Sequence, residues 1–198
     1  MSLISVIDEV CDEVTIDRFD AIYGNPDPDA LTMLDLAQQA GDEISRRADW
    51  QALLRTGTIL ASNVSLPSDF QRLTPGGGIR TSTGQFIRPV TNSGQWAVVS
   101  QMTPAQPYYF ISSGKIRVAP ASAAVSAIMD YLSKSWVQNG AAFKDRYSAD
   151  DDTAVFPERL LMKNVVWRWR RQKGLAYDDQ LAEFEADLVS EINADRGA

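Results

Sequence analysis

The chain has 198 residues, of which 44% are hydrophobic and 23% charged, and its formal net charge is −7. This length suits one domain with an elaboration or two small domains, and the apolar content is enough to form a core. The acidic balance argues against a protein whose whole surface binds nucleic acid by releasing counterions.

Several chemical classes are excluded by what the composition lacks. Histidine is absent and the single cysteine is Cys11, so histidine-based triads, zinc sites of histidine and cysteine, and an internal disulfide are all excluded. We interpret Cys11 as a small buried residue of an N-terminal helix. The start of the chain has no basic n-region, and no apolar run approaches the roughly 18–20 residues that span a bilayer. We therefore expect an intracellularly made protein without a membrane segment or a cofactor.

Two helices are predicted in the first quarter of the chain. Apolar residues recur at helical spacing over residues 3–14, and the prolines and glycine of residues 17–29 predict a surface loop. Asp27 or Asp29 is expected to cap a second helix, which runs from about Pro28 to Arg47. Gly41 lies in this helix, where a small residue would permit close helix packing.

From Trp50 the pattern changes to that of strands. We predict a strand around residues 53–57, a short strand or turn after the loop at residues 66–70, and another short strand at residues 84–90. A short helix is expected at residues 96–99, started by one of residues 91–93. The glycines Gly76, Gly77 and Gly78 follow Pro75 and predict a flexible loop tip of the kind that often carries contacts.

The clearest hairpin signal is at residues 107–118. Two β-rich runs flank a short turn that contains Gly114. Residues 121–137 are ambiguous. Their alanines favour a helix, while the family resemblance described below implies a strand that ends in the pattern of Tyr131, Ser133 and Trp136, and we predict a strand.

The C-terminal stretch predicts an αα-hairpin. A helix starts near Phe156, with Pro157 at its first position, and its apolar stripe contains Leu161, Val165 and Trp169. Gly174 is the expected left-handed residue after this helix, with the next residue, a leucine, folding back onto it. A second helix runs from about residue 177, with its apolar residues at helical period.

Three aspartates, Asp150, Asp151 and Asp152, precede this hairpin in an acidic inter-element loop. Carboxylates could hold Mg²⁺ or Ca²⁺, but the glycine and terminal glutamate of an EF-hand loop are missing. A solvated acidic loop is the favoured interpretation. Gly76 to Gly78 likewise lack the lysine and the strand-to-helix setting of a phosphate-binding loop.

Aromatic and basic residues alternate in the run Trp167, Arg168, Trp169, Arg170 and Arg171. Single-strand binders use this combination, but on a helix the two tryptophans point about 200° apart and form no single stacking platform. We assign Trp169 to the core. We assign Trp167, Arg168, Arg170 and Arg171 to a candidate protein interface, because tryptophan and arginine are enriched at interface centres.

The order and spacing of several motifs resemble the head-to-tail adaptor (connector) proteins of tailed bacteriophages. The resemblance covers about two-thirds of the chain and rests on the following stretches of its sequence: Leu66-Pro67-x-Asp69-Phe70-x-Arg72-Leu73, Tyr131-x-Ser133-x-x-Trp136, Asp150-x-Asp152, Pro157-Glu158-x-Leu160-Leu161, Trp167-Arg168-Trp169-Arg170 and Lys173-Gly174-Leu175-x-Tyr177. With the predicted elements it implies an α+β fold: a helical bundle of residues 1–49 and 138–198, with an inserted antiparallel β-rich subdomain of residues 50–137.

The resemblance also implies a function. Such a protein is a non-enzymatic component of the virion neck, assembled in the host bacterial cytoplasm as a ring, commonly a dodecamer, between the portal protein and the tail or the next neck protein. Double-stranded DNA would pass through its lumen without specific binding, and the Gly76–Gly78 loop would face the tail. The candidate interface of Trp167, Arg168, Arg170 and Arg171 would contact a neighbouring subunit or the portal. The alternatives are another neck protein such as a tail terminator or stopper, a nucleic-acid-binding module that uses the tryptophan–arginine run, and a metal hydrolase that uses the aspartates.

Overall fold

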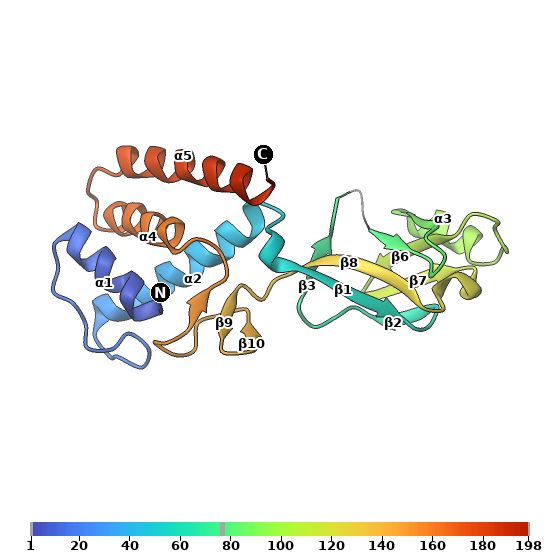
Figure 1. Ribbon diagram of the computed structural model, residues 1–198, viewed down its shortest axis with the longest axis horizontal. Helices are drawn as coiled ribbons and strands as arrows, with labels where there is room; N and C mark the ends of the chain where they lie inside the picture. Colours follow the sequence, from blue (N-terminus) through green and yellow to red (C-terminus); the bar gives the residue numbers. More distant parts are fainter. Residues whose placement is uncertain (1, 76–77, 198) are drawn as a thin grey trace. The chain divides into compact units, whose positions relative to one another are not determined.

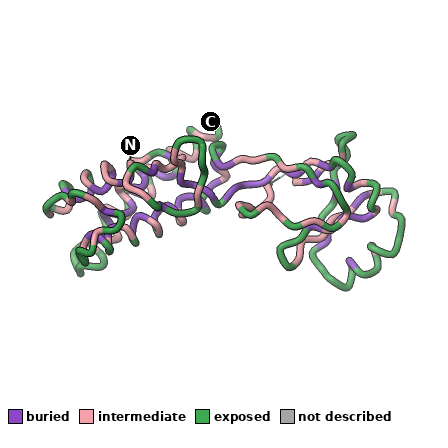
Figure 2. Tube along the Cα trace, turned by 90° about the horizontal axis from the view of Figure 1, so that it is seen from below, coloured by how far each residue is buried: buried purple, intermediate pink, exposed green. Residues whose placement is uncertain are grey.

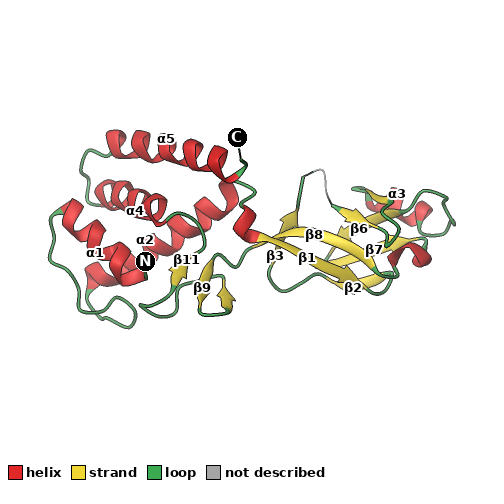
Figure 3. Cartoon of the chain, viewed as in Figure 1, coloured by secondary structure: helices red, strands yellow, loops and turns green. Residues whose placement is uncertain are grey.

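The computed structural model describes residues 2–75 and 78–197 of the chain (Figure 1). The chain divides into two compact units, a helical unit of residues 1–53 and 134–198 and a β-rich unit of residues 54–133. Helices occupy both ends of the chain and strands its middle, which confirms the α+β class (Figure 3). No helix in the described ranges combines the length and the apolar character needed to cross a membrane.

The helical unit is organised around α4 (Glu158–Gln172), which packs against α1 (Leu3–Val14), α2 (Pro28–Arg47) and α5 (Asp178–Asp195). Because α4 has neighbours on three sides, its buried positions form a broad face: they are Leu160, Leu161, Asn164, Val165, Val166, Trp167 and Trp169. The predicted bounds of α1 and α2 are confirmed. The N-cap of α2 is Asp27, whose Oδ1 accepts hydrogen bonds from the amides of Asp29 and Ala30 at 2.8 and 3.3 Å.

The turn between α4 and α5 has the predicted left-handed glycine. Gly174 has φ 71°, and the amides of Gly174 and Leu175 donate to the carbonyls of Arg171 and Arg170 at 3.1 and 2.8 Å, which is the Schellman pattern. Two details differ from expectation. Pro157 is the N-cap residue of α4 rather than its first helical residue, and Leu175 stays 52% exposed instead of folding back onto the helix.

Gly41 of α2 faces an aromatic ring rather than another helix. The indole of Trp136 lies so close that a Cβ added at residue 41 would be 2.1 Å from it, and the ring donates from Nε1 to Asp42 Oδ1 at 3.1 Å. Trp136 stands immediately before a small sheet that the sequence did not predict, formed by β9 (Val137–Asn139), β10 (Ala142–Lys144) and β11 (Thr153–Ala154) in the order β10-β9-β11. The close packing at Gly41 therefore joins α2 to this sheet region.

The β-rich unit is a curled mixed sheet with the strand order β1-β8-β4-β5-β6-β7-β2, and β3 also pairs with β8. Its strands are β1 (Leu54–Ile59), β2 (Asn63–Ser65), β3 (Phe70–Leu73), β4 (Ile79–Arg80), β5 (Phe86–Pro89), β6 (Tyr108–Ser112), β7 (Lys115–Ala119) and β8 (Ala127–Ser133). The two ends of this order, β1 and β2, are consecutive in the chain and only three residues apart, so the sheet must curl back on itself. We predicted an antiparallel sheet, but the β5–β6 pair is parallel, so the sheet is mixed.

The predicted hairpin and strands of this unit are confirmed. Ser113 and Gly114 both have positive φ, 51° and 69°, as a two-residue type I′ turn between β6 and β7 requires. Residues 121–137 contain a 3-10 helix, Ala121–Ala124, and then β8. The predicted short helix is α3 (Ser93–Val99), capped by Asn92. Burial alternates over the first five residues of β8, where Ala127, Met129 and Tyr131 are buried and Ile128 and Asp130 are half-buried. Figure 2 colours the chain by burial.

Candidate assembly interface

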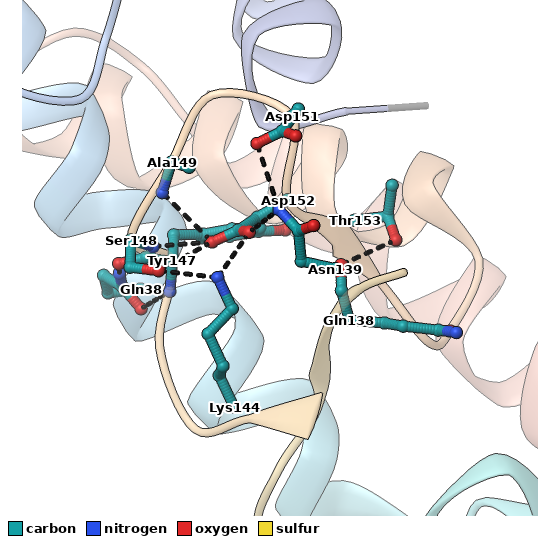
Figure 4. Close-up of polar contacts among 10 residues, drawn as sticks. All are labelled: Gln38, Gln138, Asn139, Lys144, Tyr147, Ser148, Ala149, Asp151, Asp152 and Thr153. Atoms are coloured by element: carbon teal, nitrogen blue, oxygen red, sulfur yellow. Dashed lines mark hydrogen bonds and ion pairs between the residues drawn. The ribbon is translucent and has the colours of Figure 1, made fainter. Parts of the chain in front are cut away.

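The loop between β10 and β11 is organised by a buried carboxylate, Asp152 (Figure 4). Its Oδ2 accepts hydrogen bonds from the amides of Ser148 and Ala149 at 2.6 and 3.1 Å, and its Oδ1 accepts from Lys144 Nζ at 2.6 Å and Asn139 Nδ2 at 2.8 Å. Burial alone would raise its pKa, but these hydrogen bonds and the lysine charge outweigh burial and lower the pKa to about 2. The interpretation of a solvated loop is therefore wrong for Asp152.

Asp150 connects the same loop to the N-terminal region of the helical unit by hydrogen bonds. Its carboxylate accepts from the amides of Ile22 and Tyr23, the latter at 2.7 Å. The main-chain carbonyls of Asp152 and Asp150 accept from the amides of Leu3 and Ile4 at 2.7 and 3.2 Å. These two amides are among the first of α1, which have no partner inside the helix. The loop thus completes the start of α1.

The third aspartate has fewer hydrogen-bond partners. Asp151 is exposed, and its Oδ1 accepts from Asn139 Nδ2 at 3.1 Å. Within residues 2–75 and 78–197, no group of three or more acidic or cysteine side chains is arranged to hold a metal ion. The three aspartates lie close together as the sequence implies, and their observed partners are the protein's own amides and side chains.

Of the predicted interface residues, Arg168 is bound within the helical unit. Its Nη2 donates to Glu43 Oε2 of α2 at 2.6 Å, and Asn164, which is fully buried, donates to the same oxygen at 3.0 Å. Burial opposes ionisation of Glu43, but the hydrogen bonds from Asn164 and Arg168 prevail and lower its pKa. This cluster joins α4 to α2, and neither the spacing nor the composition of the sequence identifies the glutamate that pairs with Arg168.

Trp167 and Arg170 also have partners near the C-terminal end of α4. Trp167 is 7% exposed, with the guanidinium of Arg168 at 4.7 Å and that of Arg171 at 5.8 Å from its ring centre. Its indole N–H has no acceptor among the described residues. Arg170 Nε donates to the carbonyl of Ala176 at 2.7 Å, across the turn to α5. Among the four predicted residues, Arg171 has the most exposed side chain, and its observed contact is the one with the Trp167 ring.

The predicted tail-facing loop falls partly outside the description, because Gly76 and Gly77 lie outside the described residues. Gly78 has φ 55°, and its carbonyl accepts from the amide of Asp130 in β8 at 3.0 Å. The structure therefore brings Gly78 to the β-rich unit, while the aspartates and the tryptophan–arginine run belong to the helical unit.

Comparison with known proteins gives one family. The family model described as "SU10 adaptor protein" matches residues 1–198, the whole chain. No curated protein matches the chain.

Proposed function

The chain belongs to the SU10 adaptor protein family, a family of phage head-to-tail adaptors, and on that premise we propose that it forms a ring between the portal and the tail and continues the DNA channel. The observation that carries the proposal is the family match over residues 1–198. As a phage structural adaptor the protein interacts with portal and tail proteins. We place it in the virion neck after assembly in the host cytoplasm, as a structural protein and not an enzyme.

A ring requires heterologous contacts, in which one surface of each copy meets a different surface of the next. The net charge of −7 supports a lumen through which DNA slides without adhering, because acidic walls repel phosphates. The copy number is expected to follow the symmetry of the portal, commonly a dodecamer in such families.

The portal contact is proposed at the C-terminal end of α4. Arg171 is exposed and carries no internal ion pair in the described structure, whereas Arg168 is held by Glu43. Trp167 supports Arg171 from beneath, and its indole N–H still lacks an acceptor. The Gly76–Gly78 loop remains the proposed contact with the tail.

The test is reconstitution with the purified portal ring of the same phage. An adaptor binds the portal directly, whereas a tail terminator or a stopper binds a tail component or another neck protein instead. Binding to the portal that is weakened by Arg171→Glu supports both the function and the contact. Binding only to a tail component would replace this proposal by the other neck role.

A further inference from the structure

The two units carry formal charges of opposite sign. Residues 54–133 contain six basic and two acidic residues, a charge of +4, and the remaining residues contain 13 basic and 24 acidic residues, a charge of −11. No acidic residue occurs between Asp69 and Asp130 in the sequence. The overall charge of −7 does not reveal this division. The β-rich unit is a basic unit of an acidic protein.

Both acidic residues of the β-rich unit are bound within it. Asp130 pairs with Arg80 and accepts from Thr56 Oγ1 at 3.0 Å, and Asp69 accepts from the hydroxyl of Tyr131 at 3.0 Å. Three cationic side chains of the unit have no hydrogen bond or ion pair with any described residue: Arg88, Lys115 and Arg117. Their charges are therefore available to an external partner.

These three cations lie on one face of the sheet. Arg88 of β5 is paired with Tyr108 of β6, and Phe110 and Ser112 of β6 are paired with Arg117 and Lys115 of β7. Paired residues of neighbouring strands share a face, as do alternate residues of one strand, so all three cations project from the outer face. The opposite face carries the interior residues of the sheet, such as Ile87, Ile116 and Val118.

An open groove beside α3 adds apolar surface to this face. Trp96 of α3 stacks on Phe110 with ring centres 5.7 Å apart, and next to it lies a groove of about 370 Å³. Arg117, Trp96, Met102 and Asn63 are among its lining residues, and no carboxylate lines it. Met102, which lines the groove, is 61% exposed. An uncompensated arginine beside exposed apolar side chains is the pattern of a protein-binding surface.

A protein fits this face better than DNA. Three free cations would neutralise about three phosphates, which gives only weak and strongly salt-dependent binding, and exposed apolar side chains contribute little to phosphate contacts. The protein's own helical unit, at −11, supplies the complementary charge. In a ring of identical copies, two different surfaces of the chain meet at every junction.

Within the helical unit, α1 presents an acidic face that is only partly compensated by basic side chains. Asp8 and Asp12, and likewise Glu9 and Glu13, are four residues apart, and like charges at that spacing destabilise a helix. The last turn of α1 contains two of these acids and no basic residue, contrary to the preference of the helix dipole. Arg18 pairs with Asp12 alone, which leaves Glu9 and Glu13 exposed and without a partner in the described structure. A basic surface from outside would relieve this repulsion.

We propose that the basic outer face of the β-rich unit, defined by Arg88, Lys115, Arg117 and the groove beside α3, binds the acidic face of α1, defined by Glu9 and Glu13, of a second copy of this chain. The proposal rests on the proposed function, because it identifies the contact between neighbouring copies of the ring. The contact is tested without the portal, so this proposal and the proposed function can fail separately.

The experiment is sedimentation velocity of the full chain over a range of protein and salt concentrations. We expect concentration-dependent association at low salt that weakens as salt is added. Arg88→Glu with Arg117→Glu should weaken it by about tenfold or more, and adding Glu9→Lys with Glu13→Lys to the same chain should restore it, because the charges are exchanged between the two faces. The charge-matched control is Arg146→Glu with Arg196→Glu, which replaces two exposed cations of the helical unit. It should not reproduce the loss of association. Lys115→Glu, at an exposed position, is the second variant if the arginine pair impairs folding.

The proposal is overturned if the wild-type chain does not associate at low salt, if the basic-face variants associate normally, or if the exchanged charges fail to restore association. A filter-binding measurement with double-stranded DNA accompanies these. DNA binding lost in Arg88→Glu with Arg117→Glu, together with unchanged self-association, would assign the face to nucleic acid instead. Failure of the wild type to bind the portal would contradict the proposed function. It would not change the conclusion from sedimentation about the contact between copies of the chain.

Discussion

The indole ring of Trp136 lies directly against the backbone of Gly41, two residues that are 95 positions apart in the chain, and no side chain larger than hydrogen fits between them. A Cβ at residue 41 would be 2.1–2.4 Å from three carbon atoms of the ring. Trp136 itself is fully buried, packs against Tyr147 with ring centres 5.0 Å apart and stacks on Phe156 at 5.6 Å. It cannot move aside without disturbing both.

Gly41→Ala should therefore destabilise the helical unit by about 1–3 kcal/mol, the cost of overpacking a core, even though alanine is the better helix former. Urea denaturation measures the free energy of unfolding. Gly57→Ala is the matched control, because the nearest atom to its added Cβ is at 3.6 Å, an ordinary contact. A Gly41→Ala protein that is as stable as the wild type would show that the ring is free to move.

Asp152→Asn should destabilise the helical unit by about 3 kcal/mol, because it removes the carboxylate that pairs with the Lys144 ammonium and places an amide where two backbone amides donate. Asp151→Asn, a neighbouring and exposed substitution, is the control and should change the free energy of unfolding by less than about 0.5 kcal/mol. Equal effects of the two substitutions would contradict the buried role of Asp152.

The same carboxylate predicts an acid dependence. Its pKa is lowered from 3.8 to about 2 in the folded protein, so the unfolded chain binds the proton more readily. Stability from Asp152 is fully present above about pH 4 and is lost as the pH falls toward about 2. Urea denaturation at a series of pH values checks this: the difference between wild type and Asp152→Asn should shrink as the pH falls through that window. A difference that grows on acidification would reverse the assigned sign.

Arg168 and Arg171 are one turn apart on α4, yet we expect them to have different roles. Arg168→Ala should lower the free energy of unfolding by about 1–3 kcal/mol, because Glu43 and buried Asn164 lose a charged partner. Arg171→Ala should change it by less than about 0.5 kcal/mol and should instead weaken portal binding. Thermal unfolding and a portal pull-down distinguish the two. Loss of stability in Arg171→Ala without loss of binding would remove this residue from the proposed interface.

Elements with strong local signals could be predicted from the sequence. The period and capping residues of α1, α2 and α5 lie within the helices or next to them, and the β6–β7 turn needs only Ser113 and Gly114. The small sheet of β9, β10 and β11 has strands of two or three residues, which are too short to show a period.

The candidate sites were harder to predict, because they depend on distant partners. Asp150 binds amides about 128 residues away and Arg168 binds a glutamate 125 residues away, and nothing near either residue indicates the pairing. One signal for the basic face of the β-rich unit is visible in the sequence, namely the run without acidic residues between Asp69 and Asp130. It disappears when charge is averaged over the whole chain.

The most direct test of the adaptor assignment is native mass spectrometry of this protein mixed with the portal ring of the same phage. We predict saturable addition of one copy per portal subunit, which gives a ring that matches the symmetry of the portal. Absence of any complex with the portal, and of a ring with any other neck component, would contradict the proposed function.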